Sequence, residues 1–289
     1  MSTTALGLIL LAALAHATWN IAAKSAGSAG AAFVWLYSVA STVLYLPFAV
    51  LVLAGADVSM GTWWSAALVS GIIHTAYFVL LQRGYAVGDV SVVYPLARGT
   101  GPLLAVVFAM ILFAERPGAL GLVGAALVVS GIVVIGLTGS SSSRPGGASR
   151  GNGVLFGVMT GVMIAAYTVW DAHAVTALAI TPVLLYWGSL VTQVALLTPV
   201  ALRDVSRLRS ILLGNWLKVL AVGVLSPLAY ILVLWAMRLA PVSLVAPGRE
   251  LSVVLVTVAG WLIFREPKPA RRLAGAGTVL LGVVLVALF

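Results

Sequence analysis

The sequence contains no cysteine and few charged side chains. Without cysteine the chain can form no disulfide bond, no nucleophilic thiolate and no thiolate metal site. Only 8% of its residues are charged, whereas roughly a quarter of the residues are charged in soluble globular proteins. These two shortages exclude an ordinary soluble domain and every enzyme class that depends on a thiol.

The motifs of common hydrolytic and intramembrane enzymes are also missing. No GxSxG, HExxH or Walker sequence occurs, and Asp89 follows Ala-Val-Gly instead of the Gly-x-Gly of a GxGD site. No paired acidic residues lie deep in one half of the chain. An intramembrane enzyme, such as a hydrolase or a lipid-modifying transferase, is therefore the least favoured function. We expect no catalytic residue, no cofactor and no metal ion.

Apolar residues dominate what is present. They make up 62% of the 289 residues, and the mean hydropathy is +1.15. Because a helix needs about 20 residues to cross about 30 Å of hydrocarbon, the chain has room for ten membrane spans with short links. We predict an all-α membrane protein with spans at about 4–23, 31–54, 63–83, 91–113, 118–138, 153–172, 181–201, 214–237, 242–264 and 270–289.

The N-terminal apolar run resembles a signal peptide, because Ala15-His16-Ala17 has the small residues of a cleavage site. The basic region that precedes the apolar run of a signal peptide is missing. The second half of the chain also needs a counterpart for 153–172. We therefore interpret 4–23 as the first membrane span.

Two segments, 84–117 and 236–267, share one pattern. Each contains an apolar span interrupted by proline and arginine, and each ends in a link that carries glutamate. A Ser- and Gly-rich flexible linker, 139–152, separates the predicted repeats 1–138 and 153–289. The matched residues are Pro95 with Pro247, Arg98 with Arg249, Glu115 with Glu266, Gly124 with Gly275, Ala125 with Ala276, and Gly131 with Gly282.

Arg98 and Arg249 lie inside apolar spans, each roughly 6 Å from the centre of its span. A charge at that depth costs from a few to more than ten kcal/mol on an isolated helix, and it persists where it faces the bundle interior, a partner or water. The arginines therefore face a polar cavity, or they are neutralised structurally by Glu250 or by a distant carboxylate. Nearby prolines free backbone carbonyls, which membrane depth tolerates along a cavity, and this favours the cavity.

Polar and aromatic side chains also interrupt the first and third spans. His16, Trp19 and Asn20 share one helical face, which favours an interior position, although Trp19 also suits the interfacial aromatic belt. His74 lies near the centre of 63–83, with Tyr77 one turn later. A central histidine can bind substrate or carry a proton, and a purely structural histidine is an equal alternative at both positions.

The second half repeats these features. Tyr230 is the counterpart of Tyr77, and Tyr167 and Trp170 lie at the end of 153–172. We expect Asp171, at the same end, to be near the surface and solvated. The span 31–54 is expected to face lipid. The glycines of 118–138 allow close helix approach, either within the bundle or with a dimer partner.

The basic residues are distributed unevenly among the links. Links after odd-numbered spans carry eleven Lys and Arg, and links after even-numbered spans carry two. By the positive-inside rule the first set is cytoplasmic, which places both termini outside. The net charge of +9 therefore reflects orientation and does not indicate nucleic-acid binding. Five spans per repeat make the repeats inverted, an arrangement that places the binding site near the midplane.

These features resemble the EamA-type members of the drug/metabolite transporter superfamily. The resemblance covers the whole chain and rests on the two five-span repeats, the links FAERP at 113–117 and FREP at 264–267, and the Gly-rich fifth spans. The second link has Arg-Glu where the first has Glu-Arg. The resemblance implies a broken fourth helix in each repeat and a central cavity lined by the first, third, fourth, sixth, eighth and ninth spans. Members of this superfamily often have cytoplasmic termini, in conflict with the charge distribution.

The leading hypothesis is a secondary transporter of the cytoplasmic membrane for a small polar metabolite, such as an amino acid or another carboxylate. A lipid-intermediate flippase of the same fold is the alternative. We expect a small-molecule substrate, contact with the lipid bilayer, proton coupling through Glu250, His16 or His74 as one option, and a monomer or homodimer. The predicted substrate-binding residues are His16, Trp19, Asn20, His74, Tyr77, Tyr94, Arg98, Tyr167, Trp170, Tyr230, Arg249 and Glu250.

Overall fold

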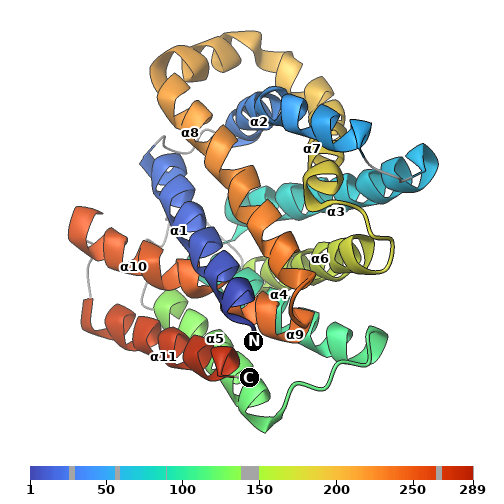
Figure 1. The fold of residues 1–289 in the computed structure, drawn as a ribbon. Helices are drawn as coiled ribbons and strands as arrows, with labels where there is room; N and C mark the ends of the chain where they lie inside the picture. Colours follow the sequence, from blue (N-terminus) through green and yellow to red (C-terminus); the bar gives the residue numbers. More distant parts are fainter. Residues whose placement is uncertain (26–29, 56–58, 89, 138–149, 265–268, 289) are drawn as a thin grey trace.

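The computed structural model describes residues 1–25, 30–55, 59–88, 90–137, 150–264 and 269–288. The body of the predicted linker, the acidic link at 265–267 and Asp89 lie outside these ranges. Within them the chain is helical, with no strand (Figure 1). The helices are α1 Thr3–Ser25, α2 Gly30–Ala54, α3 Met60–Val87, α4 Val90–Leu112, α5 Ala119–Leu137, α6 Arg150–Thr176, α7 Pro182–Ala201, η1 Leu202–Asp204, α8 Val205–Met237, α9 Val242–Gly248, α10 Leu251–Phe264 and α11 Pro269–Ala287.

The prediction of an all-α membrane protein is confirmed. Nine of the described segments are long and apolar enough to span a membrane. One of the nine, Pro182–Met237, contains both α7 and α8, and another, Val242–Ala259, covers α9 and part of α10. Large apolar side chains such as Leu51, Ile111 and Leu213 are exposed on the outer surface of the bundle, as expected for helices that contact lipid.

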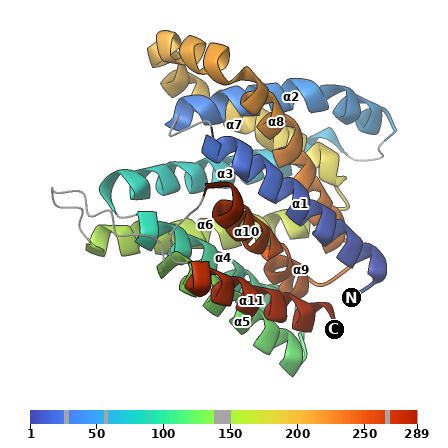
Figure 2. The same ribbon diagram turned by 90° about the vertical axis from the view of Figure 1, so that its left-hand side faces the viewer.

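The helices pack in pairs that follow the internal repeat. Helix α1 packs on α8, and its counterpart α6 packs on α3. Helix α4 packs on α6, and its counterpart α10 packs on α1. Helices α5 and α11 pair with each other, as do α2 and α7. The two views show these pairs side by side and the two termini close together (Figures 1 and 2).

Four glycines allow the close pairing of α5 with α11, one of the contacts between the repeats. A Cβ atom at Gly124 would lie 2.7 Å from the carbonyl oxygen of Gly282, and one at Gly131 would lie 2.6 Å from that of Gly275. The residue earlier in α5 therefore meets the residue later in α11, so the equivalent helices run antiparallel. The sequence left two roles open for these glycines, close packing within the bundle and contact with a dimer partner. In the structure they pack within the bundle.

Replacing Gly282 by alanine tests this contact. The new Cβ would lie 2.6 Å from the Gly124 carbonyl oxygen, so we expect a loss of about 1–3 kcal/mol from forced helix separation. A Cβ added at Gly277, also on α11, would have no atom within 4 Å, and Gly277→Ala should stabilise the helix by up to about 1 kcal/mol. Thermal unfolding in detergent compares the two variants. Equal melting temperatures would contradict the packing role.

The two repeats differ at their fourth helix. A break is present in the second repeat, where α9 ends at Gly248 and α10 begins at Leu251. The predicted break in the first repeat is wrong, because α4 runs continuously from Val90 to Leu112 through Pro95 and Pro102. Each proline in α4 removes one backbone donor without ending the helix. Arg98 is therefore held on a continuous helix, and Arg249 lies in the gap between two.

Candidate functional site

A cavity of about 510 Å³ lies between the two repeats. Its wall includes residues of α1, α3, α4, α6 and α8, and of the break between α9 and α10. These helices correspond to the six spans that the family resemblance assigns to the cavity. Helices α2 and α7 also contribute. The wall extends to Ala23, Gly30 and Tyr85, which lie near the ends of α1, α2 and α3. The cavity therefore reaches the membrane side where these three helix ends meet.

The structure brings together eleven of the twelve predicted site residues. Trp170 is the exception, because its indole Nε1 donates to the backbone oxygen of Ala66 at 3.0 Å and its ring does not line the cavity. It lies on α6 one turn after Tyr167, but its side chain is directed toward α3 instead of the cavity. The eleven that line the cavity are His16, Trp19, Asn20, His74, Tyr77, Tyr94, Arg98, Tyr167, Tyr230, Arg249 and Glu250.

Arg98, Arg249 and Glu250 form one charged cluster, named here the arginine cluster. Arg98 Nη1 lies 3.5 Å from Glu250 Oε2, and Arg249 Nε lies 3.3 Å from Glu250 Oε1. Both distances exceed the roughly 2.7–2.9 Å of a tight charge-assisted hydrogen bond. Since two guanidinium groups share a single carboxylate, the arginine cluster keeps one positive charge that no member of it neutralises.

Arg249 has an unused donor inside the cluster. Its side chain is 8% exposed, and its Nη2 atom is buried without a hydrogen-bond partner. Leaving a buried charged donor unpaired costs more than the roughly 1–3 kcal/mol of a neutral one. The predicted alternative of a purely structural ion pair therefore accounts for only part of the geometry. The arrangement has room and unmet charge for an anion, since guanidinium groups bind planar anions bidentately.

Aromatic rings surround the arginine cluster. Tyr94 lies under the Arg98 guanidinium, with 5.7 Å between the guanidinium carbon and the ring centroid, and Arg249 is 5.9 Å from the ring of Tyr167. Tyr167 stacks on His74 with ring centroids 4.1 Å apart. These rings give the cavity an apolar wall beside the charges. Such a wall suits a ligand with a charged end and a less polar body.

Asp171 differs most from its predicted environment. We expected it near the surface, because the span was assigned to 153–172, but α6 continues to Thr176 and its side chain is fully buried. Tyr230 donates its hydroxyl to Asp171 Oδ2 at 2.7 Å, and His74 Nε2 lies 4.0 Å from the same oxygen. The carboxylate is therefore part of the wall behind His74 and Tyr230, and the prediction of a solvated Asp171 is wrong.

Two helices of the wall, α2 and α7, were not predicted to line the cavity. The expectation that 31–54 faces lipid is wrong for one face of α2, which lines the cavity with Phe33, Val34 and Tyr37. Helix α7 adds Tyr186 and Gln193, whose spacing of seven places them on one helical face. That spacing was a usable signal in an otherwise apolar span. Within the described residues, no three His, Asp or Glu side chains are grouped as a metal site requires.

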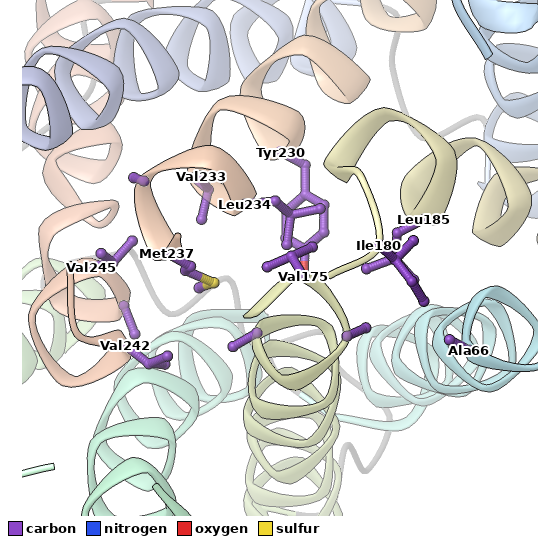
Figure 3. Close-up of a cluster of buried hydrophobic side chains, with 14 of the residues drawn as sticks. Ala66, Val175, Ile180, Leu185, Tyr230, Val233, Leu234, Met237, Val242 and Val245 are labelled. Atoms are coloured by element: carbon purple, nitrogen blue, oxygen red, sulfur yellow. The ribbon is translucent and has the colours of Figure 1, made fainter. Parts of the chain in front are cut away.

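An apolar cluster closes the other end of the cavity. Figure 3 shows buried side chains from the C-terminal ends of α6 and α8 and the N-terminal ends of α7 and α9 in contact across the bundle. Because consecutive spans alternate in direction, these helix ends lie on the membrane side opposite Ala23 and Tyr85. The cluster includes Val175, Ile180, Leu185, Val233, Leu234, Met237, Val242 and Val245.

Glu115 links the two repeats at this closed end. Its carboxylate oxygens accept hydrogen bonds from the backbone nitrogens of Val242 and Ser243, each at 2.8 Å. These amides begin α9, whose N-cap residue, Pro241, makes no side-chain cap. The acidic link of the first repeat therefore caps the broken helix of the second, which explains the Glu of FAERP.

Glu115→Ala should weaken this closure. Two largely buried amides would lose their acceptor, at about 1–2 kcal/mol, so local opening should become roughly 5- to 30-fold more frequent. The chain has no cysteine, so Ser243→Cys, at a residue that is 1% exposed, provides a single labelling site. The maleimide labelling rate of this cysteine should rise roughly 5- to 30-fold when Ser243→Cys is combined with Glu115→Ala. It should stay unchanged when Ser243→Cys is combined with Arg116→Ala, a change at an exposed neighbour. Equal rates in both backgrounds would contradict the cap.

The sequence matches the EamA-like transporter family twice, over residues 3–137 and 151–288. The chain belongs to the EamA-like transporter family. The predicted resemblance to this group of the drug/metabolite transporter superfamily is confirmed. EamA-like proteins are membrane transporters, so the cavity described above lies in a multi-pass transport protein.

Two individual proteins extend the comparison. One crystal structure, described only as a protein, superposes on this EamA-like chain with a TM-score of 0.74 at 18% identity, covering 100% of this chain and 98% of the other. At that identity the likeness shows the fold. The probable 4-amino-4-deoxy-L-arabinose-phosphoundecaprenol flippase subunit ArnE of Klebsiella pneumoniae (strain 342) is 41% identical over 46 residues, 16% of this chain. The chain covers only 41% of that relative's length.

Proposed function

We propose that this EamA-like protein is a secondary transporter of a small carboxylate-bearing metabolite, such as an amino acid or a related organic acid. The observation that carries the proposal is the arginine cluster, in which two buried guanidinium groups share one carboxylate and Arg249 Nη2 is unpaired. The arginines would bind the substrate carboxylate, and Glu250 would be available to an amine. The aromatic residues of the wall would enclose the body of the substrate.

Transport would follow alternating access between the two repeats. The described cavity reaches one membrane side, and the apolar cluster with the Glu115 cap closes the other. The excess of basic residues in the links after odd-numbered spans supports a cytoplasmic open side, with both termini outside the cytoplasmic membrane. Surface labelling of single cysteines added at the two termini of intact cells would test this orientation.

Binding of paired ligands tests the substrate class. Pyruvate, ketoisovalerate and phenylpyruvate, with alanine, valine and phenylalanine, can be compared with the amides of the same acids by thermal shift in detergent. A ligand at 100 times its Kd stabilises by about 2.7 kcal/mol, so at least one carboxylate should raise the melting temperature and its amide should not. Equal shifts from acids and amides, or none from any acid, would reject carboxylate recognition. Uptake of the stabilising acid into proteoliposomes then tests transport.

A lipid-intermediate flippase is the second candidate, because the matched relative ArnE is described as a probable flippase subunit. A flippase needs a cavity that opens sideways to lipid. Packing of α4 against α5, α6 and α9, and of α9 against α5, α8 and α11, supports the soluble-metabolite transporter instead. Movement of a fluorescent polyprenyl phosphate across proteoliposomes, without any effect of the small acids, would favour the flippase. Chemical turnover of a lipid or peptide without solute movement would favour an enzyme.

A further inference from the structure

A second pair of ionisable side chains lies at the cavity wall and is not explained by carboxylate binding. It consists of His74 on α3 and Asp171 on α6, so each repeat contributes one member. His74 Nε2 lies 4.0 Å from Asp171 Oδ2, and His74 itself lines the cavity. We name these two side chains the His–Asp pair.

The geometry assigns the roles of the two ring nitrogens. His74 Nδ1 lies 2.9 Å from the backbone oxygen of Ser70. A carbonyl oxygen only accepts, so Nδ1 carries the hydrogen of this bond and Nε2 is the nitrogen that gains or loses a proton. Nε2 faces the carboxylate, whose Oδ2 already accepts the Tyr230 hydroxyl at 2.7 Å. A proton on the pair is therefore shared between a base at the cavity and an acid behind it.

The surroundings of the pair are aromatic and cationic. Tyr167, Tyr186 and Tyr230 have ring centroids 4.1, 6.0 and 5.3 Å from that of His74. Arg249 of the arginine cluster lies on the other side of Tyr167, with its guanidinium carbon 5.9 Å from the ring that stacks on His74. Asp171 is fully buried, so water screens its charge little. The charge of the pair is therefore coupled to the charge of the arginine cluster.

The buried charges of the arginine cluster and the His–Asp pair sum to zero in two states: without ligand and proton, and with one bound monoanion and one proton. With the histidines neutral, Arg98 and Arg249 are cancelled by Glu250 and Asp171, and the two groups together have no net charge. A bound monoanion would add one negative charge, which is costly in a low-dielectric interior. One proton on the His–Asp pair removes that charge. A zwitterionic amino acid adds no net charge and needs no proton.

We propose that the His–Asp pair takes up one proton with each monocarboxylate that the arginine cluster binds, so that the protein cotransports monocarboxylate and proton in a one-to-one ratio. The inference rests on the proposed carboxylate transport. The proton passes from water on the open side to His74 Nε2 as the anion binds, and it leaves from the same atom when the anion leaves on the other side. No bond other than that to the proton forms or breaks.

The test compares keto acids with amino acids that carry the same side chain. Binding of pyruvate, ketoisovalerate and phenylpyruvate, and of alanine, valine and phenylalanine, is measured by calorimetry on the full chain between about pH 6 and about pH 8. The Kd of the keto acids should rise about tenfold per pH unit where the pair is deprotonated, and buffers of different ionisation enthalpy should report one proton taken up. The amino acids should bind equally across this range and take up none.

Three variants separate the inference from the proposed function. Asp171→Asn removes one negative charge, so it should abolish proton uptake and the pH dependence of keto-acid binding while binding itself persists. His74→Gln removes the proton acceptor but keeps the Asp171 charge, so it should abolish proton uptake at Nε2 and weaken the binding of keto acids more than that of amino acids. Arg98→Gln should weaken both ligand classes, which tests carboxylate recognition. Keto-acid binding without proton uptake in the unaltered protein would overturn the inference alone. Failure of every acid to bind would overturn the proposed function and, with it, the inference.

Discussion

Arg98→Gln is expected to weaken binding of every carboxylate ligand by roughly 30- to 150-fold. Such a loss corresponds to about 2–3 kcal/mol, the cost of removing a charged donor from a buried anion. The Arg98 side chain is 16% exposed and lines the cavity, so a ligand can reach it, and its 3.5 Å contact with Glu250 is long enough for an anion to compete. Glutamine keeps a polar side chain of similar length but not the charge.

Arg238→Gln is the matched control for this variant. Arg238 is exposed just after the end of α8, and its guanidinium carbon is 5.1 Å from the ring centroid of Trp235. The same substitution there should leave the Kd unchanged. Thermal unfolding of both variants identifies any loss of fold. A folded Arg98→Gln protein with the affinity of the unaltered chain would show that Arg98 does not contact the ligand.

Glu250→Gln is expected to produce the largest loss of stability, about 3–5 kcal/mol. Glu250 is 1% exposed and is the shared partner of both arginines. Its neutralisation leaves two buried guanidinium groups without their direct ion-pair partner. Removing one partner of a buried ion pair carries this cost. For a chain of this size the melting temperature should fall by roughly 6–15 °C.

Two further proteins calibrate that result. Asp204→Ala removes an exposed carboxylate that caps α8 through the Arg207 amide, and it should cost only about 1 kcal/mol. The double variant Arg98→Gln, Glu250→Gln restores the original net charge of the cluster, so it should be more stable than Glu250→Gln alone. Melting temperatures measured in one detergent compare these two proteins with Glu250→Gln, Arg98→Gln and the unaltered chain. A double variant less stable than both single variants would contradict the electrostatic explanation.

The sequence could place the membrane spans because each depends on local composition. Apolar runs, proline positions and the matched pairs of the repeat are properties of one segment at a time, and they predicted the helices to within a few residues. The boundaries differed where a helix extended into a polar link. Helix α8 begins at Val205 instead of near 214, and it has a non-helical backbone at Asn215, where the expected span began.

Most residues of the candidate site could also be predicted from the sequence, because a buried charge in an apolar span has few tolerable environments. Arg98 and Arg249 were singled out for this reason, and both line the cavity. The prediction for Trp170 was wrong because the sequence identified its helix but not the direction in which its side chain points within the bundle. Trp170 lies one turn after Tyr167, but the Ala66 backbone oxygen on α3 accepts its indole hydrogen and holds the ring outside the cavity.

The sequence by itself determined a helical membrane protein with two related halves and a charged interior, since hydropathy, repeat spacing and buried arginines belong to single segments. Only the tertiary structure decided that Glu250 lies between both arginines, that Glu115 caps α9 across the repeat, and that Asp171 is buried against Tyr230. Each of these contacts joins helices from different repeats or sets the rotation of a helix in the bundle. The packing of helices distant in sequence fixes such contacts, and no local pattern encodes it.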